Sequence, residues 1–378
     1  MKVGVPKEMT AGERRVGLVP DGVTKLVAAK LELSIQAGAG SEAFFADDAY
    51  QKAGATIVPD AQGLFKGADA ILKVQPPNLE EVAWMRAGAL SISFLQPSTH
   101  ADVVKALARQ QVTAFSLELV PRISRAQSMD ALSSQAGVSG YKAVLIAATR
   151  LPRFFPLLIT AAGTVTPARV LVLGAGVAGL QAIATARRLG AVVEAYDVRP
   201  AVKEEVKSLG ASFVELALEA QEGQGGYAKE QSEEFLKRQR ELIGDHVAAA
   251  DVVITTAAIP GRRAPVLVTK DMVTRMRPGS VIVDLAADSG GNVESTRAGE
   301  VTVVNGVTVD GTRNIPSTMP VHASQLFSRN VSALLLALVK DGKLNLDFND
   351  DIVKGACLTH GGEVVHPRAK EVLEASKA

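Results

Sequence analysis

Three glycines with a fixed spacing separate an apolar stretch from an amphipathic one. Gly174, Gly176 and Gly179 form the pattern GxGxxG at the end of the apolar run RVLVLG. The pattern alone is weak evidence, but a second apolar run, VVEAYD, ends in Asp197 about 20 residues further on, as a dinucleotide-binding unit requires. The sequence therefore predicts a strand, a tight turn and a helix whose first amides bind a pyrophosphate.

Each residue of this pattern has a separate expected role. Gly174 permits the tight turn, Gly176 lets the backbone approach a pyrophosphate, and Gly179 lets helix and strand pack closely. Asp197 is placed to accept hydrogen bonds from ribose hydroxyls and would repel a 2′-phosphate, which favours NAD(H) over NADP(H). Arg199 complicates this, since an arginine here can favour a 2′-phosphate, and Asp197 could instead cap the following helix.

A second polar group lies in residues 121–137, where a long helix is predicted from Gln127 to about Arg150. The polar side chains of this segment are Arg122, Ser124, Arg125, Gln127, Ser128, Asp130 and Ser133. In a helix, Gln127, Asp130 and Ser133 would project from one side. They could simply cap and solvate the start of the helix. Alternatively, the cluster could hold a carboxamide or a pyrophosphate.

Other reactive groups are few. The five histidines are scattered, and Cys357 is interpreted as a small buried apolar residue, because no neighbouring residue resembles an activating base. A single cysteine allows no internal disulfide, which fits a reducing compartment. The formal net charge of +1 gives no strong field for nucleic acid or an anionic membrane. We find no metal-ligand spacing and no apolar run of about 20 residues, so we expect no metal site and no membrane insertion.

Short β-type runs alternate with helical runs along most of the 378 residues. This alternation predicts an α/β protein with two Rossmann-like, doubly wound parallel-sheet domains. Two long helices, the second from about Pro316 to Val339, would join them, with a cleft between. The expected domains are 1–126 plus 316–378, and 127–315. The polar stretch 218–235 is either a solvated insertion or a lid over a ligand.

Several longer motifs go well beyond the glycine pattern. They are PRISRAQSMDALSSQ, TAAGTVTPARVLVLGAGVAGLQAIATARRLGA, GGYAKE, ITTAAIPGRRAP and PGSVIVDLAADSGGN. They are similar to signatures of the alpha subunit of proton-translocating NAD(P) transhydrogenase, and the resemblance covers nearly the whole chain.

The resemblance implies an activity and its partners. The chain would bind NAD(H), and hydride would pass directly between NADH and NADP⁺ held by a beta subunit, coupled to proton translocation by a separate membrane-spanning subunit. It would form a homodimer, inactive alone, in the cytoplasm and peripheral to the inner membrane. Direct hydride transfer needs oriented rings and excluded water, and it needs no protein nucleophile.

The resemblance also assigns residues. Positioning of the nicotinamide side, the catalytic role, falls to Arg122, Gln127, Asp130 and Ser133. Besides these and the three glycines, the implied nucleotide contacts are Ile123, Ser124, Arg125, Val177, Asp197, Val198, Arg199, Gly226, Tyr227 and Ala258.

Two other functions compete with this interpretation. Alanine dehydrogenase resembles the sequence more distantly, and Arg15, Lys73 and Asp288 match three of the four residue types that surround pyruvate there. Gln96 lies near the position of the expected histidine, and His100 is interpreted as a helix-start residue. The other alternative is a non-enzymatic NAD(H)-binding sensor, which would bind NADH without hydride transfer.

Overall fold

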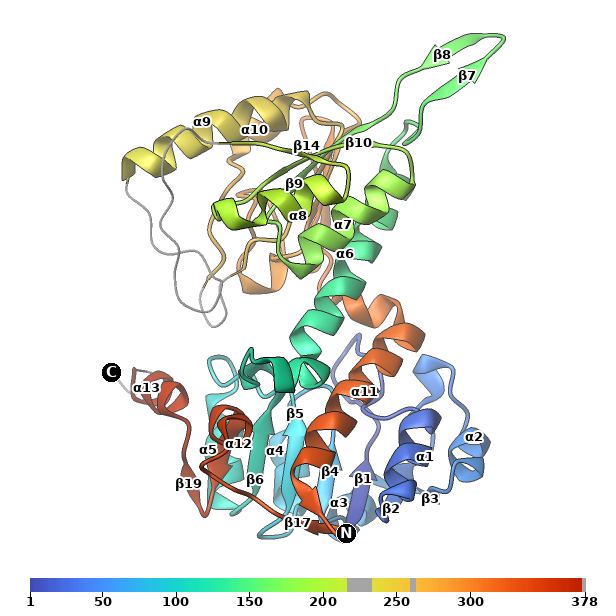
Figure 1. Ribbon diagram of the computed structural model, residues 1–378, viewed down its shortest axis with the longest axis vertical. Coiled ribbons are helices and arrows are strands. Elements are labelled where there is room, and N and C mark those ends of the chain that lie inside the picture. The colour runs from blue at the N-terminus through green and yellow to red at the C-terminus, as the bar shows by residue number, and fades with distance from the viewer. Residues whose placement is uncertain (216–232, 259–262, 376–378) are drawn as a thin grey trace. The chain divides into compact units, whose positions relative to one another are not determined.

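The computed structural model describes residues 1–215, 233–258 and 263–375. Its helices and strands form two α/β units, each built on a largely parallel sheet of Rossmann-like topology (Figure 1). The predicted fold class is confirmed in this respect. Gly226, Tyr227 and most of the expected lid lie outside the described residues.

The division of the chain differs from the predicted one at two points. Unit 1 comprises Met1–Gln135 and Ser317–Ala378, and unit 2 comprises Ala136–Pro316. Residues 127–135 thus belong to unit 1 rather than to the glycine-bearing unit. Hydrogen bonds within unit 1 explain this: the Asn330 side chain donates to the Ser128 carbonyl oxygen and accepts from the Ser134 hydroxyl.

Unit 1 has a sheet with the strand order β19-β18-β6-β5-β4-β1-β2-β3. The strands from β3 to β6 pair in parallel, and β18 and β19 continue the sheet in antiparallel fashion. Their bounds are β1 Lys2–Val5, β2 Glu32–Gln36, β3 Thr56–Val58, β4 Ala70–Leu72, β5 Leu90–Ser93, β6 Thr113–Ser116, β18 Cys357–His360 and β19 Glu363–Val364. The C-terminal segment therefore returns to the first unit, as expected.

Helices cover the faces of this sheet. They are α1 Pro20–Ala28, α2 Asp47–Lys52, α3 Ala61–Gly67, α4 Leu79–Trp84, α5 Ala101–Arg109, α11 Pro320–Ala337, α12 Asp351–Ala356 and α13 Pro367–Ala375, with 3-10 turns η1 Ser41–Ala43, η2 Leu117–Leu119 and η3 Ser124–Met129. A small hairpin, β16 Val339–Lys340 and β17 Lys343–Leu344, follows α11. The β-type run 113–120 forms a strand only in its first half, because its second half forms η2.

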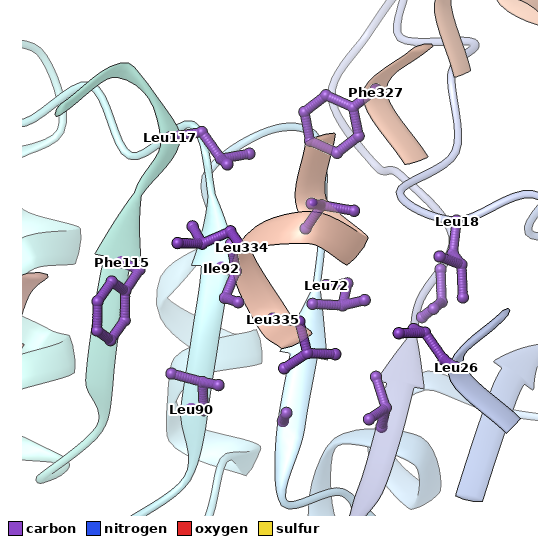
Figure 2. Close-up of a cluster of buried hydrophobic side chains, with 14 of the residues drawn as sticks. Leu18, Leu26, Leu72, Leu90, Ile92, Phe115, Leu117, Phe327, Leu334 and Leu335 are labelled. Atoms are coloured by element: carbon purple, nitrogen blue, oxygen red, sulfur yellow. The ribbon is translucent and has the colours of Figure 1, made fainter. Parts of the chain in front are cut away.

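The apolar face of α11 packs against the centre of the unit 1 sheet. Phe327, Leu334 and Leu335 from this helix share one buried cluster with Leu72 of β4 and Phe115 of β6 (Figure 2). All five side chains are fully buried. The last long helix is therefore an integral component of unit 1.

Unit 2 has a sheet with the strand order β11-β10-β9-β12-β13-β15-β14. Its bounds are β9 Arg169–Leu173, β10 Val192–Tyr196, β11 Ser212–Phe213, β12 Val252–Thr255, β13 Val281–Asp284, β14 Val301–Val304 and β15 Val307–Asp310. All pairings are parallel except that of β14 with β15. The β-type run 302–309 forms a hairpin rather than one strand, because Asn305 and Gly306 both have positive φ and form its turn.

The helices of unit 2 flank this sheet. They are α6 Ala131–Arg150, whose first turn still belongs to unit 1, α7 Val177–Arg188, α8 Lys203–Ser208, α9 Glu233–Ala249 and α10 Lys270–Arg275, with 3-10 turns η4 Pro200–Val202, η6 Ala287–Ser289 and η7 Ile315–Thr318. A further hairpin, β7 Leu158–Thr160 and β8 Gly163–Val165, extends away from the unit 2 sheet (Figure 1). The sequence analysis did not predict it.

Candidate functional site

The turn after β9 requires glycine at its first position. Gly174 has φ of +101°, and a Cβ atom there would lie 2.5 Å from the Thr256 hydroxyl oxygen. The same hydroxyl donates a hydrogen bond of 3.0 Å to the Gly174 carbonyl oxygen. A side chain at residue 174 would therefore meet both a strained backbone and an occupied position.

The other two glycines differ sharply from each other. A Cβ atom on Gly179 would lie 1.8 Å from the Gly174 carbonyl oxygen, so close packing of α7 on the turn excludes any side chain. A Cβ atom on Gly176, the N-cap of α7, would meet no atom of the described residues within 4 Å, apart from its chain neighbours. Packing therefore explains Gly179 but not Gly176. The open backbone at Gly176 fits the approach of a phosphate group to the first amides of α7.

This turn lies where the strand order of unit 2 reverses direction. β9 and β12 are parallel neighbours, and the chain leaves them toward opposite edges of the sheet. Residues 174–179 follow β9, and residues 256–258 follow β12, with Ala258 exposed. Such a point at the carboxyl ends of parallel strands is where doubly wound sheets bind ligands.

Asp197, at the end of β10, is surrounded by hydrogen-bond donors. Its Oδ2 atom accepts from the Ala175 backbone N–H at 2.7 Å and from the Arg199 Nη2 at 2.8 Å. Its Oδ1 atom accepts from the Arg199 backbone N–H and Nε, both at 2.9 Å. The carboxylate thus joins the glycine turn to the end of β10. It does not cap the following helix, whose N-cap residue is Val202.

A buried amide that the sequence analysis missed holds the loop after β12. Asn292 accepts a hydrogen bond from the Ala257 N–H at 3.0 Å, and its own side-chain nitrogen donates to the carbonyl oxygens of Ala257 and Pro265, both at 2.8 Å. Asp284 in turn accepts from the Asn292 N–H and the Thr255 hydroxyl. The motif VDLAADSGGN carried the signal, because a polar side chain that ends a buried strand needs partners.

The polar segment of unit 1 does not begin α6 as predicted. Ser124–Met129 form a 3-10 turn, and α6 begins only at Ala131. Asp130 separates the two, and its carboxylate accepts from the Ser133 N–H at 2.8 Å and the Ser133 hydroxyl at 2.6 Å. Gln127 therefore does not lie on the same helix as Ser133. The helix begins later because Asp130 caps it.

The remaining members of this segment have distinct environments. Arg125 forms two hydrogen bonds, of 2.6 and 3.0 Å, with Asp350, the N-cap of α12, and is thereby tied to the C-terminal region of unit 1. Arg122, Ser124 and Gln127 are exposed, and Ile123 is partly buried. The structure thus brings 122–133 together at one end of α6.

The corresponding switch point of unit 1 is filled by charged side chains. Lys73, which follows β4, is 2% exposed and lies 2.8 Å from Glu81 and 3.6 Å from Glu8. Burial raises the pKa of Glu8 to about 7, against the opposing charge of Lys73. Glu8 also accepts a 2.6 Å hydrogen bond from the Val74 N–H, while its second oxygen has no hydrogen-bond partner among the described residues.

A second buried ion pair adjoins the first. Arg15 donates to both carboxylate oxygens of Glu13, at 2.8 and 2.6 Å, and to the Gln135 side chain at 2.9 Å. Gln75 donates to Glu13 at 2.7 Å. Burial would raise the pKa of Glu13, but the hydrogen bonds and charge of Arg15 outweigh it and hold that pKa at about 2. Both cations of unit 1's switch point are therefore neutralised within the protein.

Comparison with known proteins identifies the family. The model of the alanine dehydrogenase/PNT N-terminal domain matches residues 4–139, and that of the C-terminal domain matches residues 143–367. The chain belongs to the alanine dehydrogenase/PNT family. This family combines the two activities that the sequence analysis set against each other, so the individual relatives decide between them.

Within the alanine dehydrogenase/PNT family, the transhydrogenase relatives are markedly more similar. An NAD(P) transhydrogenase alpha subunit chain of Rhodospirillum rubrum is 48% identical over 97% of this chain and 98% of its own length. Alanine dehydrogenase of Bacillus subtilis is 30% identical over 97% and 93%. The structure of the Sinorhizobium meliloti transhydrogenase, 45% identical, superposes with a TM-score of 0.89 over 97% of this chain and 100% of its own. The chain is thus a homologue of transhydrogenase alpha subunits.

The positions that suggested an alanine dehydrogenase differ in their surroundings. Arg15 and Lys73 are buried in ion pairs with glutamates. Asp288, in unit 2, accepts from the Arg313 guanidinium at 2.7 Å. Gln96 is exposed, and His100 is the N-cap residue of α5, which confirms its interpretation as a helix-start residue.

Three further observations limit the chemistry of the described residues. Burial raises the pKa of the Cys357 thiol to about 12, which confirms its interpretation as a buried, unreactive group. In the described parts of the chain, no cluster of histidine, cysteine and acidic residues could hold a metal ion. The described helices also include none that is both long and apolar enough to cross a membrane.

Proposed function

We propose that this chain is the NAD(H)-binding alpha subunit of a proton-translocating NAD(P) transhydrogenase. The observation that carries the proposal is the open backbone at Gly176, beside a turn that packing fully explains at Gly174 and Gly179. Asp197 supplies an acceptor at the end of the neighbouring strand. The 48% identity to a transhydrogenase alpha subunit adds independent support.

In this proposal, unit 2 holds the adenosine and pyrophosphate groups of NAD(H). The first amides of α7, from Val177 onward, bind the pyrophosphate, and Asp197 accepts from the ribose hydroxyls. Val198 and Arg199 line the ribose, and Ala258 flanks the nucleotide after β12. Gly226 and Tyr227 close over it, an assignment that rests on the family resemblance alone.

We assign binding of the nicotinamide end of NAD(H) to residues 122–133. The Asp130 carboxylate fixes the Ser133 hydroxyl through a 2.6 Å hydrogen bond, which leaves the oxygen of that hydroxyl able to accept from a carboxamide. Gln127 is exposed and offers both a donor and an acceptor. Arg122 adds a positive charge, while Ile123, Ser124 and Arg125 shape the same segment.

The proposed chemistry is orientation rather than acid-base catalysis. The reduced nicotinamide supplies the hydride when NADH is bound. Neutral and internally paired polar groups are suited to fix a ring, because no proton is taken from or given to the protein. The described residues of this segment include no histidine or cysteine.

The partners follow from the same proposal. NADP(H) would be held by a beta subunit, and a membrane-spanning subunit would couple hydride transfer to proton translocation. The chain itself would lie in the cytoplasm, peripheral to the inner membrane. It would be inactive alone, since it supplies only one of the two nucleotides.

We also propose that the chain forms a homodimer, and the β7–β8 hairpin supports this. Ile159 is 73% exposed, and Leu157, Val165 and Phe154 are also exposed on or beside the hairpin. An isolated two-stranded hairpin is at best marginally stable in water, and exposed apolar patches usually mark interfaces. In this proposal, a second copy of the same chain covers the hairpin.

The proposal is tested by two steps on the purified chain. NADH fluorescence should first report binding, which Gly176→Ala should weaken. Hydride transfer to NADP⁺ should then require an added NADP(H)-binding partner. Binding without transfer to any such partner would favour the sensor alternative.

A further inference from the structure

Asn330 lies on the core helix α11 and contacts the segment to which we assign the nicotinamide end of NAD(H). The residue is almost fully buried, at 7% exposed. Its Nδ2 atom donates to the Ser128 carbonyl oxygen at 2.9 Å, and its Oδ1 atom accepts from the Ser134 hydroxyl at 2.7 Å. One amide group thus uses both its donor and its acceptor on the same segment.

The two contacts lie on either side of a break in the backbone. The 3-10 turn η3 ends at Met129, and α6 begins at Ala131. Asp130, between them, has φ of −74° and ψ of +85°, which is outside the helical region. No continuous ladder of helical hydrogen bonds therefore fixes the turn relative to the helix. Asn330 contacts the chain before the break and again after it.

The break carries polar groups that the proposed function uses. The Asp130 carboxylate accepts from the Ser133 N–H and hydroxyl, but these hydrogen bonds fix the two residues only relative to each other. Met129 shares a buried apolar cluster with Phe327 of α11 (Figure 2). Apolar contact is not directional, whereas hydrogen bonds fix orientation. The amide of Asn330 therefore provides directional contacts from the core to this segment.

We propose that Asn330 is a positioning residue for hydride transfer, which holds Asp130 and Ser133 in the orientation that the nicotinamide ring needs. The inference rests on the proposed function, because it concerns the same segment. Hydride transfer depends steeply on geometry, and a misplacement of about 1 Å can slow a reaction by about 100-fold. Binding of the adenosine and pyrophosphate groups is assigned to unit 2, so the affinity for NADH depends much less on Asn330.

The experiment replaces Asn330 by aspartate in the full chain. Asn330→Asp is nearly isosteric and keeps an acceptor for Ser134, but it places a carboxylate oxygen against the Ser128 carbonyl oxygen. Fluorescence titration measures the affinity for NADH. A single turnover at saturating NADH measures hydride transfer to NADP⁺ held by a transhydrogenase beta subunit. Transfer should slow at least about tenfold, while the dissociation constant for NADH changes less than about threefold.

Two further measurements distinguish positioning from a general loss of structure. Deuterium at the transferred position of NADH should slow Asn330→Asp at least as much as the unchanged chain, because the slowed step is the transfer itself. Ser328→Ala is the matched control, since the Ser328 hydroxyl is buried on the same helix and accepts from the Val19 N–H at 3.2 Å. This control should lower the melting temperature and leave transfer unchanged.

The outcomes separate this inference from the proposed function. Absence of transfer from the unchanged chain to any such partner would overturn the proposed function. Transfer at the full rate in Asn330→Asp, or an equal loss in Ser328→Ala, would overturn the positioning role alone. A loss of NADH affinity as large as the loss of transfer would also overturn it. Should Asn330→Asp fail to fold, Ser134→Ala removes the other contact, and normal transfer in that variant would overturn the role.

Discussion

At the residue scale, Gly176 and Gly179 differ in why glycine is needed: packing requires it at Gly179, and we propose that ligand binding requires it at Gly176. Both belong to one sequence pattern, yet only Gly179 is enclosed by protein atoms. A pattern cannot distinguish a glycine that packing requires from one that a ligand requires. The three-dimensional surroundings of each Cβ position make that distinction.

This difference gives a paired prediction for substitution by alanine. Gly179→Ala should lower the free energy of unfolding by about 1 to 3 kcal/mol, because its Cβ would overlap the Gly174 carbonyl oxygen. Gly176→Ala should leave the melting temperature unchanged, since its φ of −79° suits alanine, and should weaken NADH binding at least about tenfold. Thermal melts and NADH titrations on both variants check this. Equal loss of stability in both would contradict the assignment.

Asn292 should matter for the nucleotide although it lies behind the loop. Asn292→Asp would replace two donated hydrogen bonds by repulsion between a carboxylate and the carbonyl oxygens of Ala257 and Pro265. We expect a loss of about 1 to 3 kcal/mol in the free energy of unfolding and weaker NADH binding. Asn305→Asp is the control, since Asn305 is exposed and its side chain donates to the Thr274 carbonyl oxygen, which lies outside the loop after β12. An Asn292→Asp variant that binds NADH normally would show that the loop needs no such anchor.

Glu8 gives unit 1 a pH dependence of stability. Its pKa is about 7 in the folded chain and 4.5 when unperturbed, so the folded state keeps a proton that the unfolded state has lost. Stability from this group is present below pH 4.5 and is lost as pH rises toward 7. Glu13 acts in the opposite sense, but its stabilisation is lost only as pH falls from 4.5 toward 2.

The test compares urea unfolding at pH 5 and pH 8. Between pH 5 and pH 8, the free energy of unfolding of the unchanged chain should fall on the order of 1 to 3 kcal/mol more than that of Glu8→Gln. The groups around Glu8 are Lys73, Glu81, Glu13 and the Val74 N–H. Glu80→Gln, on the same helix as Glu81 but exposed, should leave the pH profile unchanged. A profile that Glu8→Gln does not alter would rule out this role.

At the element scale, the sequence predicted strands well where they are buried and apolar. β9 and β10 fall where the apolar runs RVLVLG and VVEAYD predicted them. The helix after Pro121 was predicted too early, because the 3-10 turn and the cap at Asp130 break an otherwise helical pattern. The β7–β8 hairpin was missed because LITAAGTVTP has no alternation that would bury one face.

The hairpin supports a prediction about association. Ile159→Asp should convert the proposed homodimer into a monomer. Dimer formation would bury the new carboxylate in an apolar interface without an opposite charge, and such burial is strongly unfavourable. The free energy of unfolding of the monomer should change little. Sedimentation at several concentrations measures the state of association.

Leu79→Asp provides the control for that experiment. Leu79 is an exposed apolar residue at the start of α4, outside the hairpin, and should not affect association. A dimer that survives Ile159→Asp, or a chain that is a monomer before any change, would remove the hairpin from the interface.

At the scale of the whole molecule, the two units share the order of the parallel strands around their switch points, β3-β2-β1-β4-β5 in unit 1 and β11-β10-β9-β12-β13 in unit 2, but use those switch points differently. In unit 2 the point is lined by glycines and holds Asp197. In unit 1 it is filled by Arg15, Lys73 and three buried glutamates. Sequence motifs revealed the first site because its residues are contiguous. They could not reveal the second, whose charges come from separate segments and pair only after folding.

This contrast bears on the alanine dehydrogenase alternative. A 2-oxo acid would need a cation to receive its carboxylate, and both candidate cations of unit 1 already pair with glutamates. Residue types alone could not show that Arg15 and Lys73 pair with glutamates in the folded chain. The surroundings of those residues, together with the identity to transhydrogenase subunits, favour the other activity.

The most direct test of the central claim follows NADH absorbance in two reactions at equal protein concentration. One contains pyruvate and ammonium, and the other contains NADP⁺ with an NADP(H)-binding beta subunit of a transhydrogenase. We predict that NADH is consumed only in the second, and more slowly when Gln127 is replaced by alanine. Consumption only in the first would contradict the account and make the chain an alanine dehydrogenase.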